Sequence, residues 1–286
     1  MDFLQPTSWA DALAAKADHP DGVAIAGGTD LMVGLNFGQP PPPALIDLTR
    51  VTELSEWARD NGTTRIGAGV TYRRIIDEIA AACPALAAAS RTVGSPQIRN
   101  RATVAGNLGT ASPAGDAHPP LLATGATVEV ESVRGPRLID IDEFFTGVKR
   151  NALAPDELIR AVRVPVAAGP QRFAKVGTRN AMVIAVCSVA VALDPARRGV
   201  GTGIGSAAPT PRRARDAEEF AAEALPWSTL DDLDPALAEE FGARVAAAAS
   251  PIDDVRAAAG YRRHALAVLA RRALAWTWAE LKGGRS

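Results

Sequence analysis

Two glycine-rich segments carry the residue types that could hold a phosphorylated ligand. The first, Ala26-Gly27-Gly28-Thr29-Asp30-Leu31, directly follows a short apolar run. Glycine lets the backbone turn tightly and approach a ligand, exposed N–H groups can bind a pyrophosphate, and Thr29 adds a hydroxyl donor. The same residues also fit an ordinary strand-to-helix turn with Thr29 or Asp30 as the N-cap. A phosphate-binding loop and a structural turn both remain open.

The second segment, residues 99–116, concentrates small side chains that can form hydrogen bonds. These side chains are Thr103, Asn107, Thr110, Ser112 and Asp116. Because residues 91–118 show little apolar periodicity, we expect a long loop without regular structure that contributes nothing to a core. Such a loop inside a compact region is usually functional, and wrapping round a polar ligand would satisfy its polar groups. A well-ordered surface loop is the alternative.

Other chemistry-bearing residues receive a structural interpretation. The glycine run Gly199–Gly205 lacks the GxGxxG spacing of a dinucleotide-binding turn, so we interpret it as strand and turn. Signatures of serine hydrolases, P-loop NTPases and zinc proteases are absent from the sequence. His118 precedes Pro119-Pro120 and is interpreted as part of a turn. Lys175 alternates with apolar neighbours on a predicted strand, and the pattern leaves open whether its polar face meets solvent or a ligand.

Composition excludes several function classes. Two cysteines, Cys83 and Cys187, cannot form a four-thiolate iron–sulfur cluster, and three histidines without ligand spacing disfavour a zinc site. The 31 Lys+Arg residues balance 32 Asp+Glu residues, which disfavours nucleic acid as a partner. Apolar stretches shorter than about 18 residues predict no transmembrane helix. The N-terminal residues lack the basic start and apolar run of a signal peptide, so we expect a cytoplasmic protein.

The elements that must position these segments fall into two groups. Ser8 and Asp11 predict a helix start before Trp9–Lys16, and Thr71 predicts a helix through Ile79. With strands expected at 23–26, 44–47 and 64–66, the first part alternates strands and helices, which favours α/β layering. Further strands are expected at 126–132 and 138–141.

A proline- and glycine-containing stretch at 164–170 is the best linker candidate. Beyond it, strands are expected at 171–176, 182–193 and 200–207, and alanine-rich helices at about 214–224, 235–249 and 262–281. Strands followed by helices are typical of a separate α+β domain.

In this order, the segments resemble the FAD-binding medium subunit of the xanthine dehydrogenase and carbon monoxide dehydrogenase family. The resemblance covers nearly the whole chain. It rests on residues 26–31, 94–101, 103–116, 153–158, 173–179, 251–256 and 261–263. It implies an α+β protein with a vanillyl-alcohol-oxidase-like (PCMH-type) FAD-binding domain at 1–167, made of two α/β subdomains divided near 55–60. Residues 168–286 would form a domain with a three-stranded antiparallel sheet and three helices.

The resemblance also implies a cofactor site. In it, 24–31 would form the first pyrophosphate loop, a second loop would hold the diphosphate, ribityl chain and flavin edge, and two further residues would approach the isoalloxazine. The implied residues are Ala24, Ile25, Ala26, Gly27, Gly28, Thr29, Asp30, Leu31, Thr103, Gly106, Asn107, Thr110, Asp116, Ile159 and Lys175. Neither loop offers His or Cys at a motif position, so FAD is expected to be noncovalent. Ala105 stands where the family usually has glycine, and we expect a small local shift there.

The implied function is electron transfer within a larger complex. In such enzymes a large molybdopterin subunit oxidises the substrate, a small subunit with two [2Fe–2S] clusters passes on the electrons, and FAD reduces NAD⁺ or another acceptor. The resemblance implies a dimer of heterotrimers and favours purine (xanthine) oxidation. The alternatives are a self-sufficient FAD-dependent oxidase or reductase, for which His118 is the nearest acid/base candidate, and a flavin-free interaction protein.

Overall fold

The first part of the chain begins with a small parallel sheet. In the computed structural model, which describes residues 1–284, the strand order is β1 (Asp2–Leu4), β3 (Ala44–Asp47), β2 (Val23–Ile25). Helix α1 (Trp9–Asp18) joins β1 to β2, and α2 (Leu31–Asn36) joins β2 to β3. The Ser8 side chain accepts a hydrogen bond from the Asp11 N–H, so the predicted N-cap is confirmed. Because β2 and β3 are parallel neighbours, the segments that follow them leave the sheet at the same edge.

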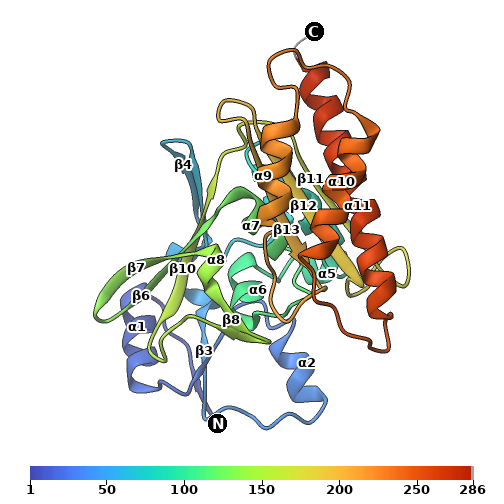
Figure 1. Ribbon diagram of the computed structural model, residues 1–286. Helices are drawn as coiled ribbons and strands as arrows, with labels where there is room; N and C mark the ends of the chain where they lie inside the picture. Colours follow the sequence, from blue (N-terminus) through green and yellow to red (C-terminus); the bar gives the residue numbers. More distant parts are fainter. Residues whose placement is uncertain (285–286) are drawn as a thin grey trace.

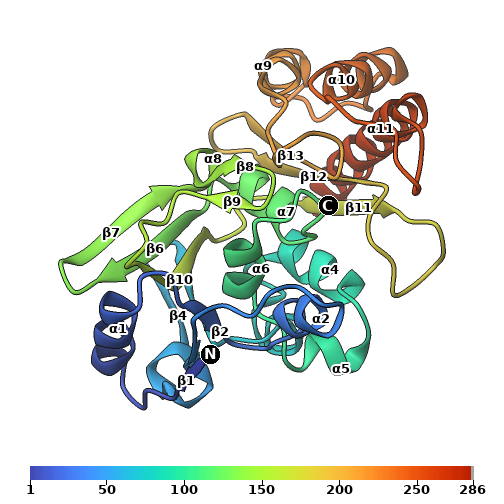
Figure 2. The ribbon, with the colours of Figure 1, turned by 90° about the horizontal axis from the view of Figure 1, so that it is seen from below.

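A larger antiparallel sheet follows. Its order is β4 (Trp57–Asp60), β5 (Thr63–Gly67), β10 (Leu158–Pro165), β6 (Thr127–Ser132), β7 (Gly135–Asp140). A two-stranded ribbon of β8 (Phe145–Gly147) and β9 (Arg150–Asn151) follows the short helix α8 (Ile141–Phe144). Thr71 caps α3 (Tyr72–Arg74), which continues as a wider helical turn over Ile75–Ile79, as its sequence position predicted. Figure 2 shows α7 (His118–Thr124) lying between this part of the chain and the C-terminal strands.

The prediction of a structureless loop over 91–118 is wrong. After α4 (Pro84–Thr92), the region contains the short helices α5 (Pro96–Arg99) and α6 (Val104–Thr110) and the first residue of α7 (His118–Thr124). Ser95 and Thr103 cap α5 and α6 through their side-chain oxygens. Val104 and Leu108 are fully buried, so the segment does contribute to the core. Capping and tertiary packing outweigh the poor helix propensity of its glycines.

The C-terminal part is a sheet between two helical layers. Strands β11 (Gln171–Val176), β12 (Cys187–Asp194) and β13 (Gly199–Gly205) form an antiparallel sheet. Helices α9 (Arg215–Ala224), α10 (Pro235–Ala247) and α11 (Ala259–Gly283) cover one face, while α4 and α7 pack on the other (Figures 1 and 2). Strand β12 starts five residues later than the predicted 182, and Met182 itself has a left-handed backbone (φ 53°) that an extended strand excludes.

Two apolar cores correspond to these two parts. One extends from Trp9 to Val164 and the other from Cys187 to Leu281. They meet where α7 lies on the C-terminal sheet. A Cβ at Gly201 or Gly203 would come within 1.9 Å of the Ala123 carbonyl oxygen or 2.0 Å of the Pro119 carbonyl oxygen. The third glycine run therefore lets helix and sheet approach closely.

No helix within residues 1–284 combines the length and hydropathy needed to cross a membrane.

Candidate cofactor-binding site

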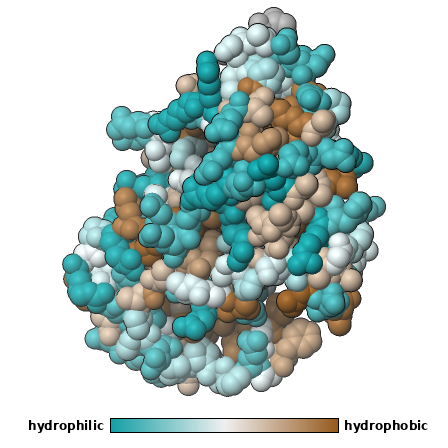
Figure 3. All heavy atoms as spheres, in the orientation of Figure 1, coloured by the Kyte–Doolittle hydropathy of each residue, from teal (hydrophilic) through white to brown (hydrophobic). Residues whose placement is uncertain are grey.

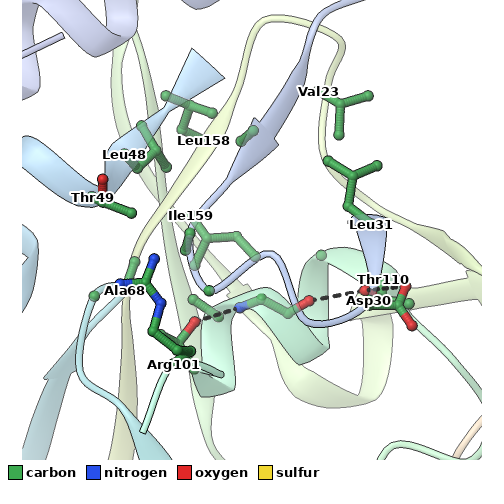
Figure 4. Close-up of a pocket in the computed structure, with 18 of the residues that line it drawn as sticks. Val23, Asp30, Leu31, Leu48, Thr49, Ala68, Arg101, Thr110, Leu158 and Ile159 are labelled. Atoms are coloured by element: carbon green, nitrogen blue, oxygen red, sulfur yellow. Dashed lines mark hydrogen bonds between the residues drawn. The ribbon is translucent and has the colours of Figure 1, made fainter. Parts of the chain in front are cut away.

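A cavity of about 800 Å³ lies where the small parallel sheet meets the rest of the first part of the chain. Its volume is within the range of sites that bind large organic ligands. Figure 4 shows its wall, with Leu48, Thr49 and Ala68 on one side and Val23 and Leu31 on the other. Residues from both glycine-rich segments line it. Those that the resemblance had implied are Ala24, Ala26, Gly27, Asp30, Leu31, Thr103, Gly106, Thr110 and Ile159.

The first glycine-rich segment contacts the second through backbone. A Cβ at Gly27 would lie 2.2 Å from the Arg101 carbonyl oxygen, so only glycine permits this approach. Gly28 has a left-handed backbone (φ +71°) that favours glycine. Asp30 stands at the N-cap position of α2 but makes no side-chain cap there; its carboxylate accepts a hydrogen bond from the Thr110 hydroxyl at 3.3 Å. Asp30 therefore has the N-cap position that the sequence left open, but its side chain contacts the second glycine-rich segment instead of capping α2.

Helix α6 presents its glycines to the cavity. The Thr103 hydroxyl accepts the Gly106 N–H at 2.9 Å and fixes the start of the helix. Gly106 and Gly109 both line the cavity, and a Cβ at Gly109 would have no heavy atom within 4 Å. Ala105 is buried inside α6 and does not have a positive φ, so its methyl group fits an ordinary helical conformation.

Asp116 and Lys175 lie outside the cavity wall and form a buried ion pair. Their charged atoms are 2.5 Å apart, and each side chain is less than a tenth exposed. Lys175 Nζ also donates to the Thr92 carbonyl oxygen at 3.2 Å, and the Thr92 hydroxyl donates to Asp116. Burial raises the pKa of Asp116, although the charge of Lys175 acts in the opposite direction. The open question about Lys175 thus has a structural answer: its strand face meets a carboxylate at the junction of the two parts.

The remaining implied residues are not among those that line the cavity. Ile25, Gly28 and Thr29 belong to the first segment but are absent from the wall. Asn107 lies on α6, and its side-chain oxygen Oδ1 is buried with no hydrogen-bond partner among residues 1–284. Asp116 Oδ1 is in the same situation. Buried acceptors without partners are unusual in proteins and point to a missing water or ligand.

His118 is enclosed rather than poised for catalysis. It is the first residue of α7 and is fully buried, with Nε2 3.2 Å from the Asn107 carbonyl oxygen and its ring against Phe145. Burial lowers the pKa of His118 to about 4. The ring is therefore neutral near pH 7, and it does not line the cavity. The interpretation of His118 as structural agrees with this position.

Sequence reasoning missed several residues of the wall, including Leu48, Thr49 and Arg101. Leu48 and Thr49 follow β3 just as the first glycine segment follows β2. Because these strands are parallel neighbours, the residues that follow them share one edge of the sheet. The pairing of two predicted strands, each followed by a polar segment, could therefore have indicated Leu48 and Thr49. Arg101 lay inside the recognised segment but carries no glycine-loop signature of its own.

The residues present fit an FAD molecule. A dinucleotide flavin combines flat apolar rings with a charged diphosphate. The wall combines apolar side chains such as Leu158 and Ile159 with polar groups such as Arg101 and Thr110. Unpaired Asn107 Oδ1 and the open space beside Gly109 are consistent with a ligand that completes the site. Within residues 1–284 no group of three or more His, Cys, Asp or Glu side chains is arranged to hold a metal ion.

Comparisons with known proteins agree with this geometry. Residues 1–167 match the family described as the FAD binding domain in molybdopterin dehydrogenase, and residues 172–277 match the CO dehydrogenase flavoprotein C-terminal domain. The chain is 30% identical over 283 residues to a putative xanthine dehydrogenase FAD-binding subunit of Escherichia coli, covering 95% of this chain and 94% of the relative. It is 37% identical to the caffeine dehydrogenase subunit beta of a Pseudomonas strain, over 58% of each chain.

Solved structures show the same fold over the whole chain. A CO dehydrogenase chain from Oligotropha carboxidovorans superposes with a TM-score of 0.89 at 27% identity, covering 98% of both chains. A carbon monoxide dehydrogenase chain from Hydrogenophaga pseudoflava gives 0.88 at 26% identity with the same coverage. The chain therefore belongs to the family of FAD-binding medium subunits of molybdenum hydroxylases, and it is an oxidoreductase flavoprotein subunit.

Proposed function

We propose that this chain passes electrons from the [2Fe–2S] clusters of a partner subunit to NAD⁺ or another acceptor, in an enzyme that oxidises xanthine or a related purine. The observation that carries the proposal is the cavity where the two glycine-rich segments meet at Gly27 and Arg101. It lies in a chain that matches flavoprotein subunits over nearly its whole length.

The cofactor site in this proposal comprises both segments and the junction. Residues 24–31, the α6 cap Thr103 and the α6 residues Gly106, Asn107 and Thr110 hold the diphosphate and its neighbours, and Ile159, which lines the cavity, is assigned to the isoalloxazine. Asp116 and Lys175, at the junction of the two parts, are assigned to the flavin edge. We place the domain boundary at 167/168, with the subdomains of the first domain divided near 55–60.

Bound FAD supplies the electron carrier, and the chain's own residues position it and shield it. Gly27 and Gly28 bring backbone close to the ligand, while Thr103 fixes the helix that presents Gly106. FAD is held without a covalent bond in this proposal. His118 is buried, and no histidine of the described chain is among the residues that line the cavity. This arrangement favours electron transfer over oxidation of a substrate bound to this chain.

The proposed assembly contains a large molybdopterin subunit and a small [2Fe–2S] subunit, as a dimer of heterotrimers in the cytoplasm. Similarity to the E. coli relative supports a purine substrate, whereas relatives named for caffeine, nicotinate and nicotine show how widely the substrate varies. Two buried cysteines without a disulfide fit a reducing compartment.

Purification of the chain with its partners tests the proposal. We expect a flavin absorption spectrum, free FAD released by acid, and copurification of a molybdenum subunit and a cluster-bearing subunit. Flavin that stays with the denatured polypeptide would contradict noncovalent binding. Substrate turnover by this chain alone, without molybdenum, would instead establish the self-sufficient oxidase or reductase.

A further inference from the structure

Most charged groups on the cavity wall already have partners. Lys16 Nζ donates to the carbonyl oxygens of Pro20 at 2.9 Å and Gly22 at 2.5 Å, and burial lowers its pKa. The Glu157 carboxylate is held by two hydrogen bonds from the Arg137 guanidinium, at 2.6 and 2.7 Å. These two wall residues therefore stabilise the protein itself and are not available to a ligand.

Two cations of the wall, Arg101 and Lys149, have no side-chain partner within residues 1–284, and Arg101 is the one that belongs to a glycine-rich segment. It lines the cavity, is exposed, and makes no side-chain hydrogen bond or ion pair with any residue in 1–284. Figure 4 shows its side chain extending along the wall toward Ala68 and Thr49, on the opposite side from Asp30 and Thr110. The Asp30 carboxylate is thus directed away from this cation, toward a hydroxyl. The Arg101 side of the cavity is left with uncompensated positive charge.

The backbone of Arg101 is fixed although its side chain is not. Its N–H donates to the Ile98 carbonyl oxygen at 3.0 Å, and its own carbonyl oxygen leaves no room for a Cβ at Gly27. Arg101 thus stands at the point where the two glycine-rich segments touch. Ser55 lines the same cavity, and its hydroxyl oxygen lies 3.2 Å from where a Cβ of Gly69 would stand.

We infer that Arg101 binds the diphosphate of FAD from the side of the cavity opposite Asp30 and Thr110. This inference rests on the proposed function and deepens it, because it assigns a cation of the cofactor site to the cofactor's phosphates. Guanidinium presents paired N–H donors that match two phosphate oxygens, so the contact gives direction as well as charge. A hydrogen bond to a charged group typically contributes enough for a roughly 10- to 150-fold change in affinity.

Titration of the flavin-free full-length chain with FAD tests the inference. We would compare wild type, Arg101→Gln, Arg101→Lys and the control Arg91→Gln at several salt concentrations. Arg91 is exposed on α4, lies outside the cavity and has no side-chain partner in the described chain, so its substitution removes the same charge elsewhere. Salt screens an ion pair in a cavity that is open to solvent, so wild-type affinity is expected to fall as salt rises.

Arg101→Gln is expected to weaken FAD binding by roughly 10- to 150-fold at low salt and to flatten the salt dependence. Arg101→Lys keeps the salt dependence with an intermediate loss, and Arg91→Gln behaves as wild type. Unchanged affinity in Arg101→Gln, or a loss with the wild-type salt dependence, would overturn the inference. If Arg101→Gln does not fold, the Arg101→Lys variant tests the inference instead. Wild-type affinity for FAD in Arg101→Lys would show that no paired guanidinium contact is needed and would overturn the inference. Absence of FAD binding by the wild type would refute the proposed function itself, a separate outcome.

Discussion

Replacing Lys175 by Met should destabilise the protein strongly. The substitution leaves Asp116 buried beside Thr92 without its cation, which now lies 2.5 Å away. Both side chains are less than a tenth exposed, so water cannot replace the lost partner. Removal of one member of a buried pair typically costs about 3–5 kcal/mol of unfolding free energy. The pair also links β11 to the segment before α7, so the loss is felt at the junction of both parts.

Denaturant unfolding of the flavin-free chain measures this effect. The matched control is Lys282→Met, which breaks the ion pair with Asp232 on the surface, where Asp232 is fully exposed. Exposed pairs contribute about 0–1 kcal/mol, so the control should shift the midpoint little. The double variant Lys175→Met/Asp116→Asn removes both charges and should recover part of the loss, because no uncompensated charge stays buried.

Equal small shifts for Lys175→Met and Lys282→Met would refute this reasoning. The reasoning would also fail if the double variant lost as much unfolding free energy as Lys175→Met and Asp116→Asn lose together when measured singly, because the two charges would then be independent. Tryptophans in both parts, such as Trp57 and Trp278, allow the two transitions to be followed and compared. Coincident transitions justify a single free energy of unfolding.

Three further perturbations separate the cavity from the core. Gly109→Leu should retain or raise the melting temperature of the flavin-free protein, because glycine inside a helix costs about 1 kcal/mol relative to good helix formers. It should nevertheless abolish FAD binding, since the leucine side chain would enter the cavity. Thermal melting and an FAD titration check the two results. Asn107→Ala should weaken FAD binding roughly 5- to 150-fold if Oδ1 accepts a ligand hydrogen bond, and unchanged binding would remove Asn107 from the site. His118 has a pKa lowered to about 4 from 6.5, so the unfolded state binds a proton first and stability is lost as pH falls from about 6.5 to 4. His118→Gln should remove up to about 3 kcal/mol of that pH dependence in denaturant midpoints, and an unaltered profile would place the titration elsewhere.

The regular elements were predictable where the pattern is local. Helix α1 begins at the Ser8 cap, and β11 spans the residues that the sequence predicted, because capping and alternation act within a few residues. The region 91–118 defeated this reasoning. Its glycines and prolines suppress the apolar period, while Thr103 caps a helix whose Leu108 packs into a core assembled from distant segments.

The candidate site was predictable as segments but not as contacts. The order of the motifs predicted Gly27 and Gly106 as cofactor-binding residues, and both line the same cavity. The Asp116–Lys175 pair joins residues 59 positions apart on separate layers, and no sequence period reports such a contact. The apolar residues of α2 also stay partly exposed, and Phe37, which follows the helix, is 86% accessible beside the cavity. Figure 3 shows apolar side chains gathering in this lower region. Sequence pattern predicted no such exposure.

Reduction of the flavin in the assembled complex tests the central claim most directly. The measurement is the flavin absorbance after rapid mixing with the purine substrate, for this chain alone and for the complex with its molybdenum and cluster-bearing subunits. We expect no reduction of flavin in the isolated chain and full reduction in the complex. Reduction should be lost when the cluster-bearing subunit is left out. Rapid reduction of flavin by the substrate in the isolated chain would contradict it.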